Sequence, residues 1–161
     1  MKIRQGFVSN SSSSSFYLRR PDRSLKFSEI PEYYSFNPDV PENARAWMQI
    51  LIWEALKPER TQEEDSEYGS DYTPKEALEE YTTDSHISWM QSSESLRKPE
   101  SYWQGVKELR DNPDGLIGFG VDGYGNEVFD GVKIPYSAAA NIREYDEDVF
   151  RNPRYAVGLS E

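Results

Sequence analysis

Residues 116–134 read LIGFGVDGYGNEVFDGVKI, and this stretch decides the fold that the sequence predicts. Apolar residues on both sides flank Asp122 to Asn126, in which Gly and Asn accept the positive φ angles of tight turns. We therefore predict a β-hairpin over 116–134. Gly118 and Gly120 alternate with larger residues, so one face of the first strand is nearly bare. Another element is expected to pack closely on that face.

Three more short strands are predicted near the two ends of the chain. Residues 16–20 form an apolar and basic run that ends at Pro21, and residues 25–30 form a second run. Residues 154–159 form the last, which can join the sheet of the hairpin.

The first predicted helix begins at Pro41 and ends before Pro58. Its apolar residues recur at the i, i+3, i+4, i+7 spacing, with Trp47, Leu51 and Ile52 on the stripe. A helix this apolar is expected to be the central core helix, with a subunit contact as the alternative.

Two further helices have clear start signals. Thr73, Pro74 and Glu76 form a capping box with proline at the first helical position, which predicts a helix to about Tyr81. Asp84 is expected to cap a continuation of it that carries Ile87, Trp89 and Met90. A third helix is predicted from Pro99 to just before Pro113.

These elements predict an α+β fold, with about three helices packed on a small, mainly antiparallel sheet. The 161 residues suit one domain. We assign residues 17–161 to a single α+β domain and residues 1–16 to a serine-rich leader peptide. Residues 59–72 have no apolar periodicity and are expected to form an exposed acidic loop.

The net charge of -11 is unevenly distributed. Residues 1–26 carry six lysines and arginines against one aspartate, whereas residues 59–84 carry ten carboxylates against two basic residues. A body this acidic is repelled by phosphate backbones and anionic membranes, so nucleic acid and membrane surfaces are poor partners for it. A protein with a basic surface is the expected partner. The alternative is that the acidic residues only keep the protein soluble.

Composition excludes several kinds of chemistry. The chain has no cysteine, which excludes disulfides, thiolate metal sites and thiol catalysis. No stretch approaches the roughly 20 apolar residues that span a bilayer, and Lys2 and Arg4 stand where a secretory signal needs an apolar run.

The remaining chemical motifs are weak, so we expect no catalytic site, metal or cofactor. His86 is the single histidine, and its neighbours Asp84 and Ser85 cannot face it as a triad requires. Residues 122–126 resemble a calcium loop but have Tyr124 in place of an oxygen ligand. Residues 118–123 spell a dinucleotide fingerprint without the helix that must follow. The acidic loop could gather a hard cation, but carboxylates on one loop usually point outward.

The first sixteen residues hold an unbroken serine run between Gly6-Phe7-Val8 and Phe16. With Arg4, they resemble the peptide Arg-x-Gly-Phe-Val-Ser-Asn, followed by serines and Phe, that begins many otherwise unrelated proteins of bacteriophages and bacteria. The resemblance implies a recognition peptide read by a protease, a modifying ligase or a localising factor. The alternative is a disordered tail. The residues that match are Arg4, Gly6, Phe7, Val8, Ser9, Asn10, Ser11 and Phe16.

The leading functional hypothesis is a phage-encoded accessory protein, not an enzyme, that binds another protein in the host cytoplasm during infection. The Tyr-rich surface and the acidic loop are its candidate contacts. The alternative is a head or tail component of the virion, and an enzyme of unknown type is the third hypothesis. The acidic contact candidates are Glu63, Glu64, Asp65, Glu67 and Asp71.

Overall fold

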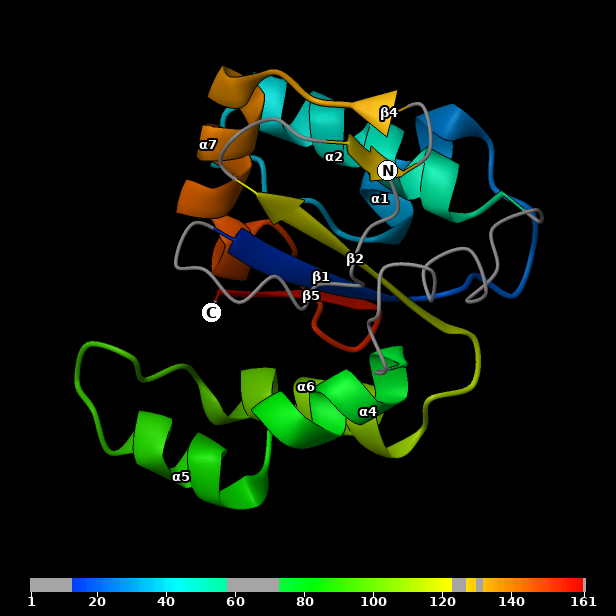
Figure 1. Ribbon diagram of the computed structural model, residues 1–161. Helices are drawn as coiled ribbons and strands as arrows, with labels where there is room; N and C mark the ends of the chain where they lie inside the picture. Colours follow the sequence, from blue (N-terminus) through cyan, green and yellow to red (C-terminus); the bar gives the residue numbers. More distant parts are fainter. Residues whose placement is uncertain (1–12, 58–72, 123–126, 130–131, 161) are drawn as a thin grey trace.

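The protein folds in three layers, with a small antiparallel sheet between two layers of helices (Figure 1). The sheet consists of β2 (Leu116–Asp122), β1 (Ser13–Arg19) and β5 (Ala156–Ser160), in that spatial order. The predicted α+β class is therefore confirmed. The computed structural model describes residues 13–57, 73–122, 127–129 and 132–160.

β1 is the central strand and pairs antiparallel along both of its edges. Its seven residues pair with β2 from Ser13 opposite Asp122 to Arg19 opposite Leu116. On the other edge, the pairs with β5 run from Ser14 opposite Ser160 to Leu18 opposite Ala156. The predicted strand at 16–20 and the joining of 154–159 to the sheet are both confirmed.

Alternation along the strands divides the apolar residues between two cores. Phe16 and Leu18 point to the core beneath α2, whereas Tyr17 between them points to the opposite core. The Tyr17 ring packs over Gly118, where an added Cβ would lie 3.1 Å from the ring. The bare strand face predicted from the glycines is therefore covered by a side chain of the neighbouring strand.

One core is closed by α1 (Ile30–Tyr33), α2 (Glu42–Ala55) and α7 (Tyr136–Glu144). The predicted helix after Pro41 is confirmed as α2, and its place as a core helix holds because its stripe is buried. α7 packs against α2 with its own small apolar face. The buried residues of α2 are Ala44, Met48, Leu51, Ile52 and Ala55.

The other core is closed by α4 (Pro74–Tyr81), α5 (Asp84–Gln91) and α6 (Glu100–Asp111). Thr73 caps α4 as predicted, because its hydroxyl accepts a hydrogen bond from the Glu76 amide at 3.2 Å. α5 is capped by Thr83, and Asp84 occupies its first turn instead of the predicted cap position.

Several predicted features differ from the structure. The predicted strand at 25–30 contains the 3-10 helix η1 (Phe27–Glu29) and the first residue of α1, because Glu29 accepts a hydrogen bond from the Lys26 amide at 2.7 Å and closes the turn. The described residues contain six α-helices, more than expected, since α1 and α7 were not predicted. The third difference concerns the hairpin.

β2 pairs with β1 in place of the predicted partner at 127–134. β1 pairs with β2 over all seven residues, and its side chains contribute to the cores on both faces of the sheet. A hairpin formed through the local turn would not require either feature. Downstream, β3 (Glu127–Phe129) and β4 (Val132–Lys133) pair antiparallel with one another. The predicted turn at 123–126 lies outside the described residues.

The boundary between leader and domain lies before Ser13, not after Phe16. Ser13–Phe16 form more than half of β1, and Phe16 is fully buried against Phe119 at a centroid distance of 5.5 Å. A residue in the central strand belongs to the fold because its backbone and its side chain are both covered.

A buried carboxyl group lies next to the start of β1. Asp146, in the 3-10 helix η2 (Asp146–Asp148), accepts a hydrogen bond from the Ser14 hydroxyl at 2.8 Å. Both residues are buried. Burial raises the pKa of Asp146 from 3.8 to about 6, and the nearby carboxylates of Glu147 and Asp148 contribute to the increase.

Truncation tests the place of β1 in the fold. Removing residues 1–12 leaves β1 complete, so we expect cooperative thermal unfolding to persist. Removing residues 1–16 deletes Phe16 and four paired positions, and losing one large core side chain alone costs about 3–5 kcal/mol. We expect this shorter chain not to fold. Circular dichroism melts of both proteins decide this, and a cooperative melt of the shorter chain would contradict the assignment.

Asp146→Asn tests the buried carboxyl. Because folding raises the pKa of Asp146, ionisation disfavours the folded state fully above pH 6 and progressively less as the pH falls towards 3.8. We expect the variant to gain thermal stability over the natural protein at pH 8 and to lose most of that advantage by pH 4.5. A stability difference that does not change between these pH values would show that Asp146 does not titrate there.

Candidate functional site

Most of the site residues predicted from the sequence lie outside the described residues. Phe16 is the exception, and it is buried in β1. The candidates that lie outside are the leader residues Arg4, Gly6, Phe7, Val8, Ser9, Asn10 and Ser11, and the acidic residues Glu63, Glu64, Asp65, Glu67 and Asp71.

The described part of the chain offers a different candidate in α5 and the turns after it. α5 projects from the body of the molecule in the layer farthest from α2 (Figure 1). The Thr83 hydroxyl accepts a hydrogen bond from the His86 amide at 3.1 Å and starts the helix. Ile87 is buried in the core with α4 and α6, so one face of α5 is attached and the opposite face is free to meet solvent.

An arginine of α6 holds the start of α5 in place. Arg110 donates to the carbonyl oxygen of Thr82 at 2.7 Å and to the carboxylate of Asp84 at 3.1 Å. The Arg110 side chain is 13% exposed and that of Asp84 is 77% exposed, so the partly buried bond to Thr82 contributes more than the ion pair. The junction between α4 and α5 is therefore fixed against α6.

The side chain of Gln91 fixes the turns after α5. Its amide donates to the carbonyl oxygen of Lys98 and accepts from the Lys98 amide, both at 3.0 Å. The same Gln91 oxygen accepts from the indole N–H of Trp103 at 2.9 Å. These three bonds close residues 92–98 into a defined loop.

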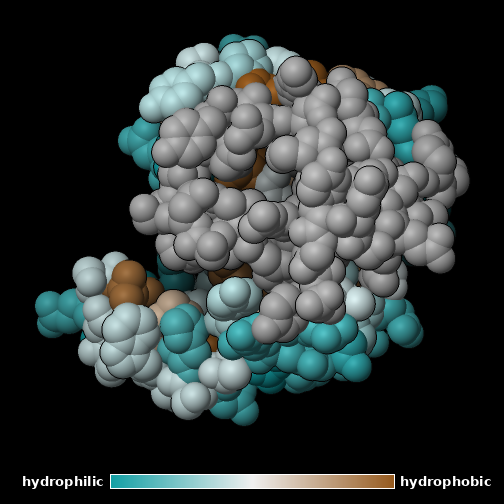
Figure 2. Space-filling model, in the orientation of Figure 1, coloured by the Kyte–Doolittle hydropathy of each residue, from teal (hydrophilic) through white to brown (hydrophobic). Residues whose placement is uncertain are grey.

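The face of α5 away from the core presents unusually exposed apolar side chains. Trp89 is 60% exposed and stacks on His86 with ring centroids 5.8 Å apart. Leu96, in the loop held by Gln91, is 40% exposed. We call His86, Trp89 and Leu96 the α5 surface. Figure 2 shows a hydrophobic group flanked by polar residues on the lobe that contains α5.

The α5 surface lies in an acidic part of the chain. Residues 76–96 contain no lysine or arginine. Glu80 and Glu94 are both exposed and form no ion pair with the rest of the described chain. The carboxylates of this stretch are Glu76, Glu79, Glu80, Asp84 and Glu94.

The tyrosines of the predicted Tyr-rich contact surface occur in several environments. Tyr17 and Tyr34 are buried, and burial raises the pKa of Tyr34. Among the described residues, Tyr81 in α4, Tyr136 in α7 and Tyr155 in the turn before β5 are exposed. Tyr68, Tyr72 and Tyr124 lie outside the described residues.

The described residues offer no other obvious chemistry. Across these ranges, no three histidine or carboxylate side chains gather as metal ligands. Within the same ranges, no helix has both the length and the apolar character to cross a bilayer. His86 lies exposed on α5, stacked on Trp89.

Comparison of the chain with protein family models, curated proteins and solved structures finds no match.

Replacing Gln91 with Met tests the hydrogen bonds that fix this loop. The buried indole N–H of Trp103 and the Lys98 backbone lose their partners, and each unsatisfied buried group costs about 1–3 kcal/mol. We expect a lower urea midpoint and faster hydrogen exchange of the Lys98 amide. Gln104→Met, at an exposed position of α6, is the control. Unchanged exchange at Lys98 would contradict the assigned bonds.

Proposed function

We propose that this protein is a phage-encoded accessory protein that works by binding another protein, with the α5 surface as the main contact. The observation that carries the proposal is the exposure of Trp89 on a helix fixed at both ends. Tryptophan is the residue type most enriched among binding hot spots, because it buries a large area at low entropic cost. A fixed surface also loses little conformational entropy on binding.

The charge around the α5 surface defines the partner. Asp84 and Glu79 are paired with basic residues, whereas Glu80 and Glu94 form no ion pair with the rest of the described chain. These two carboxylates favour a partner with an apolar patch inside a basic rim. Such complementarity raises the association rate and makes it sensitive to salt. A basic partner also complements the net charge of -11 on the whole chain.

The leader has a separate role in this proposal. We propose that it is a recognition peptide, as its resemblance to the phage and bacterial peptide implies. Ser14, Ser15 and Phe16 are buried in the folded domain. A factor that reads these three residues must therefore act before β1 is covered.

Trp89→Ala tests the contact. In a pull-down from infected cells, we expect the natural protein to capture a basic protein that elutes as salt rises, and the variant to lose that capture. Removal of a central tryptophan from an interface typically costs 2 kcal/mol or more, about thirty-fold in affinity. Binding of the purified partner is then measured by biolayer interferometry at two salt concentrations.

Tyr136→Ala is the matched control, because Tyr136 is 62% exposed on the opposite layer. Capture that persists with Trp89→Ala, or that falls equally with Tyr136→Ala, would contradict the proposed contact. Mass spectrometry of purified particles separates this proposal from a virion component, since stoichiometric copies in the particle would favour the latter.

A further inference from the structure

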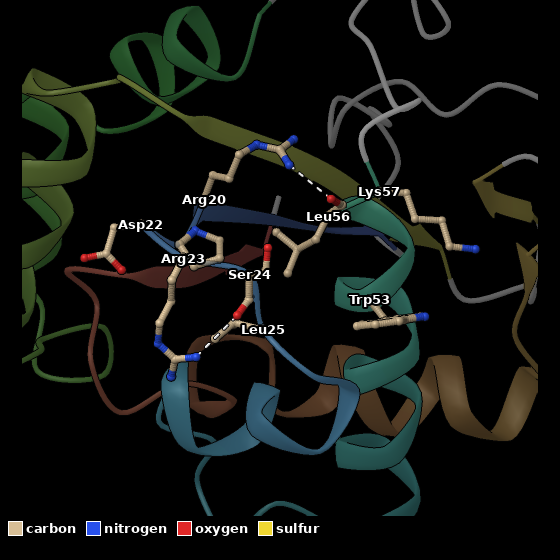
Figure 3. A pocket seen from close by; sticks show the side chains of 9 residues that line it. Arg20, Asp22, Arg23, Ser24, Leu25, Trp53, Leu56 and Lys57 are labelled. Carbon is tan, nitrogen blue, oxygen red and sulfur yellow. Dashed lines mark hydrogen bonds between the residues drawn. The ribbon is translucent and has the colours of Figure 1, made fainter.

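A groove lies on the opposite layer from the α5 surface, between the chain after β1 and the C-terminal end of α2 (Figure 3). Its volume is about 550 Å³. One wall is formed by residues 20–25, and the other by Trp53, Leu56 and Lys57. The lining therefore combines apolar groups with three basic side chains and the carboxylate of Asp22. Figure 3 shows this carboxylate pointing away from the Arg20 guanidinium.

The apolar part of the groove continues onto an exposed aromatic pair. Trp53 packs edge to face against Phe27 with ring centroids 5.7 Å apart. The Trp53 side chain remains 37% exposed, and the Phe27 side chain remains 41% exposed. The carbonyl oxygen of Phe27 accepts a hydrogen bond from the Gln49 amide at 2.8 Å, which fixes η1 to α2. The pair is thus held in place while its apolar surface stays open to solvent.

The three basic side chains are not equally available. Arg23 pairs with Glu29 at 3.1 Å, and Lys57 pairs with Glu54 at 2.9 Å. Hydrogen bonds from the Lys26 amide and then from Arg23 lower the pKa of Glu29, so that this pair stays ionised at neutral pH.

Arg20 differs from Arg23 and Lys57 in its partners. One nitrogen of its guanidinium donates to the carbonyl oxygen of Leu56 at 3.1 Å, at the negative end of the α2 dipole. Its backbone N–H donates to the carbonyl oxygen of Gly115 at 2.7 Å. Among the described residues, Arg20 forms no ion pair. A guanidinium has five N–H donors, so this fixed cation retains donors for a ligand.

We infer that this groove binds a short acidic peptide segment of a second partner protein. A large apolar side chain of the peptide lies against Trp53 and Leu56, and a neighbouring carboxylate pairs with Arg20. Arginine and tryptophan are the side chains that dominate such contacts, and an arginine–carboxylate pair adds directed hydrogen bonds.

A peptide suits the groove better than a small molecule. Small-molecule sites bury most of the ligand surface in an enclosed cavity. Here the aromatic pair extends an open wall beyond the groove, which favours an extended chain lying across it. This inference does not rest on the α5 surface, because the two sites lie in opposite layers and attract peptides of opposite charge.

Fluorescence anisotropy with three labelled peptides tests the inference. The probes are Asp-Glu-Phe-Leu-Asp-Glu, its neutral form Asn-Gln-Phe-Leu-Asn-Gln and its basic form Lys-Arg-Phe-Leu-Lys-Arg. We expect the acidic peptide to bind the full-length protein at least ten-fold more tightly than the neutral one. Arg20→Gln is expected to remove about ten-fold of that affinity, and Arg20→Lys to restore part of it.

Arg45→Gln is the matched control, because Arg45 of α2, like Arg20, donates to a backbone carbonyl, that of Val40 at 2.9 Å. Thermal melts of each variant show whether it is folded. If Arg20→Gln does not fold, Trp53→Ala supplies a second test of the groove. Equal affinity for the acidic and neutral peptides would overturn the inference. So would no binding at millimolar peptide, or losses as large with Arg45→Gln as with Arg20→Gln.

Discussion

The fold depends on one constraint, which is that β1 is covered on both faces and paired on both edges. Phe16 and Leu18 contribute to one core, and Tyr17 contributes to the other. No other described strand has neighbours on both sides within the sheet. Both helical layers therefore pack on a seven-residue strand whose partners come from the distant part of the chain, and such long-range pairing makes folding slow relative to helical bundles.

The close packing at one end of β1 explains why small residues occur there. η2 crosses the sheet so closely that a Cβ on Gly158 would lie 2.2 Å from the carbonyl oxygen of Asp146. Ser14 is small enough for this approach, and its hydroxyl satisfies the buried carboxyl of Asp146. The serine run is thus used for packing and hydrogen bonding where it enters the sheet.

Local signals predicted four of the six described α-helices and the strands near both chain ends, whereas the order of the strands in the sheet could not be predicted from the sequence. Thr73 and Pro74 start α4 through contacts within four residues, and these are visible in the sequence. The partner of β2 is β1, about a hundred residues away, and no local pattern distinguishes it from 127–134. The groove was missed for the same reason, because residues 20–25 and the end of α2 meet only in the fold. Trp89 was predicted on a helix, but its exposure follows from the fold, in which Ile87 of the same helix faces the core.

The position of β1 also limits when the leader can be read as a whole. Its sheet partners lie at residues 116–122 and 156–160, so β1 cannot be covered until nearly the whole chain has been synthesised. A factor that acts on the nascent chain therefore meets the complete sequence from Arg4 to Phe16. A factor that acts on the folded protein finds Ser14, Ser15 and Phe16 covered. Any recognition that requires Phe16 must consequently precede folding.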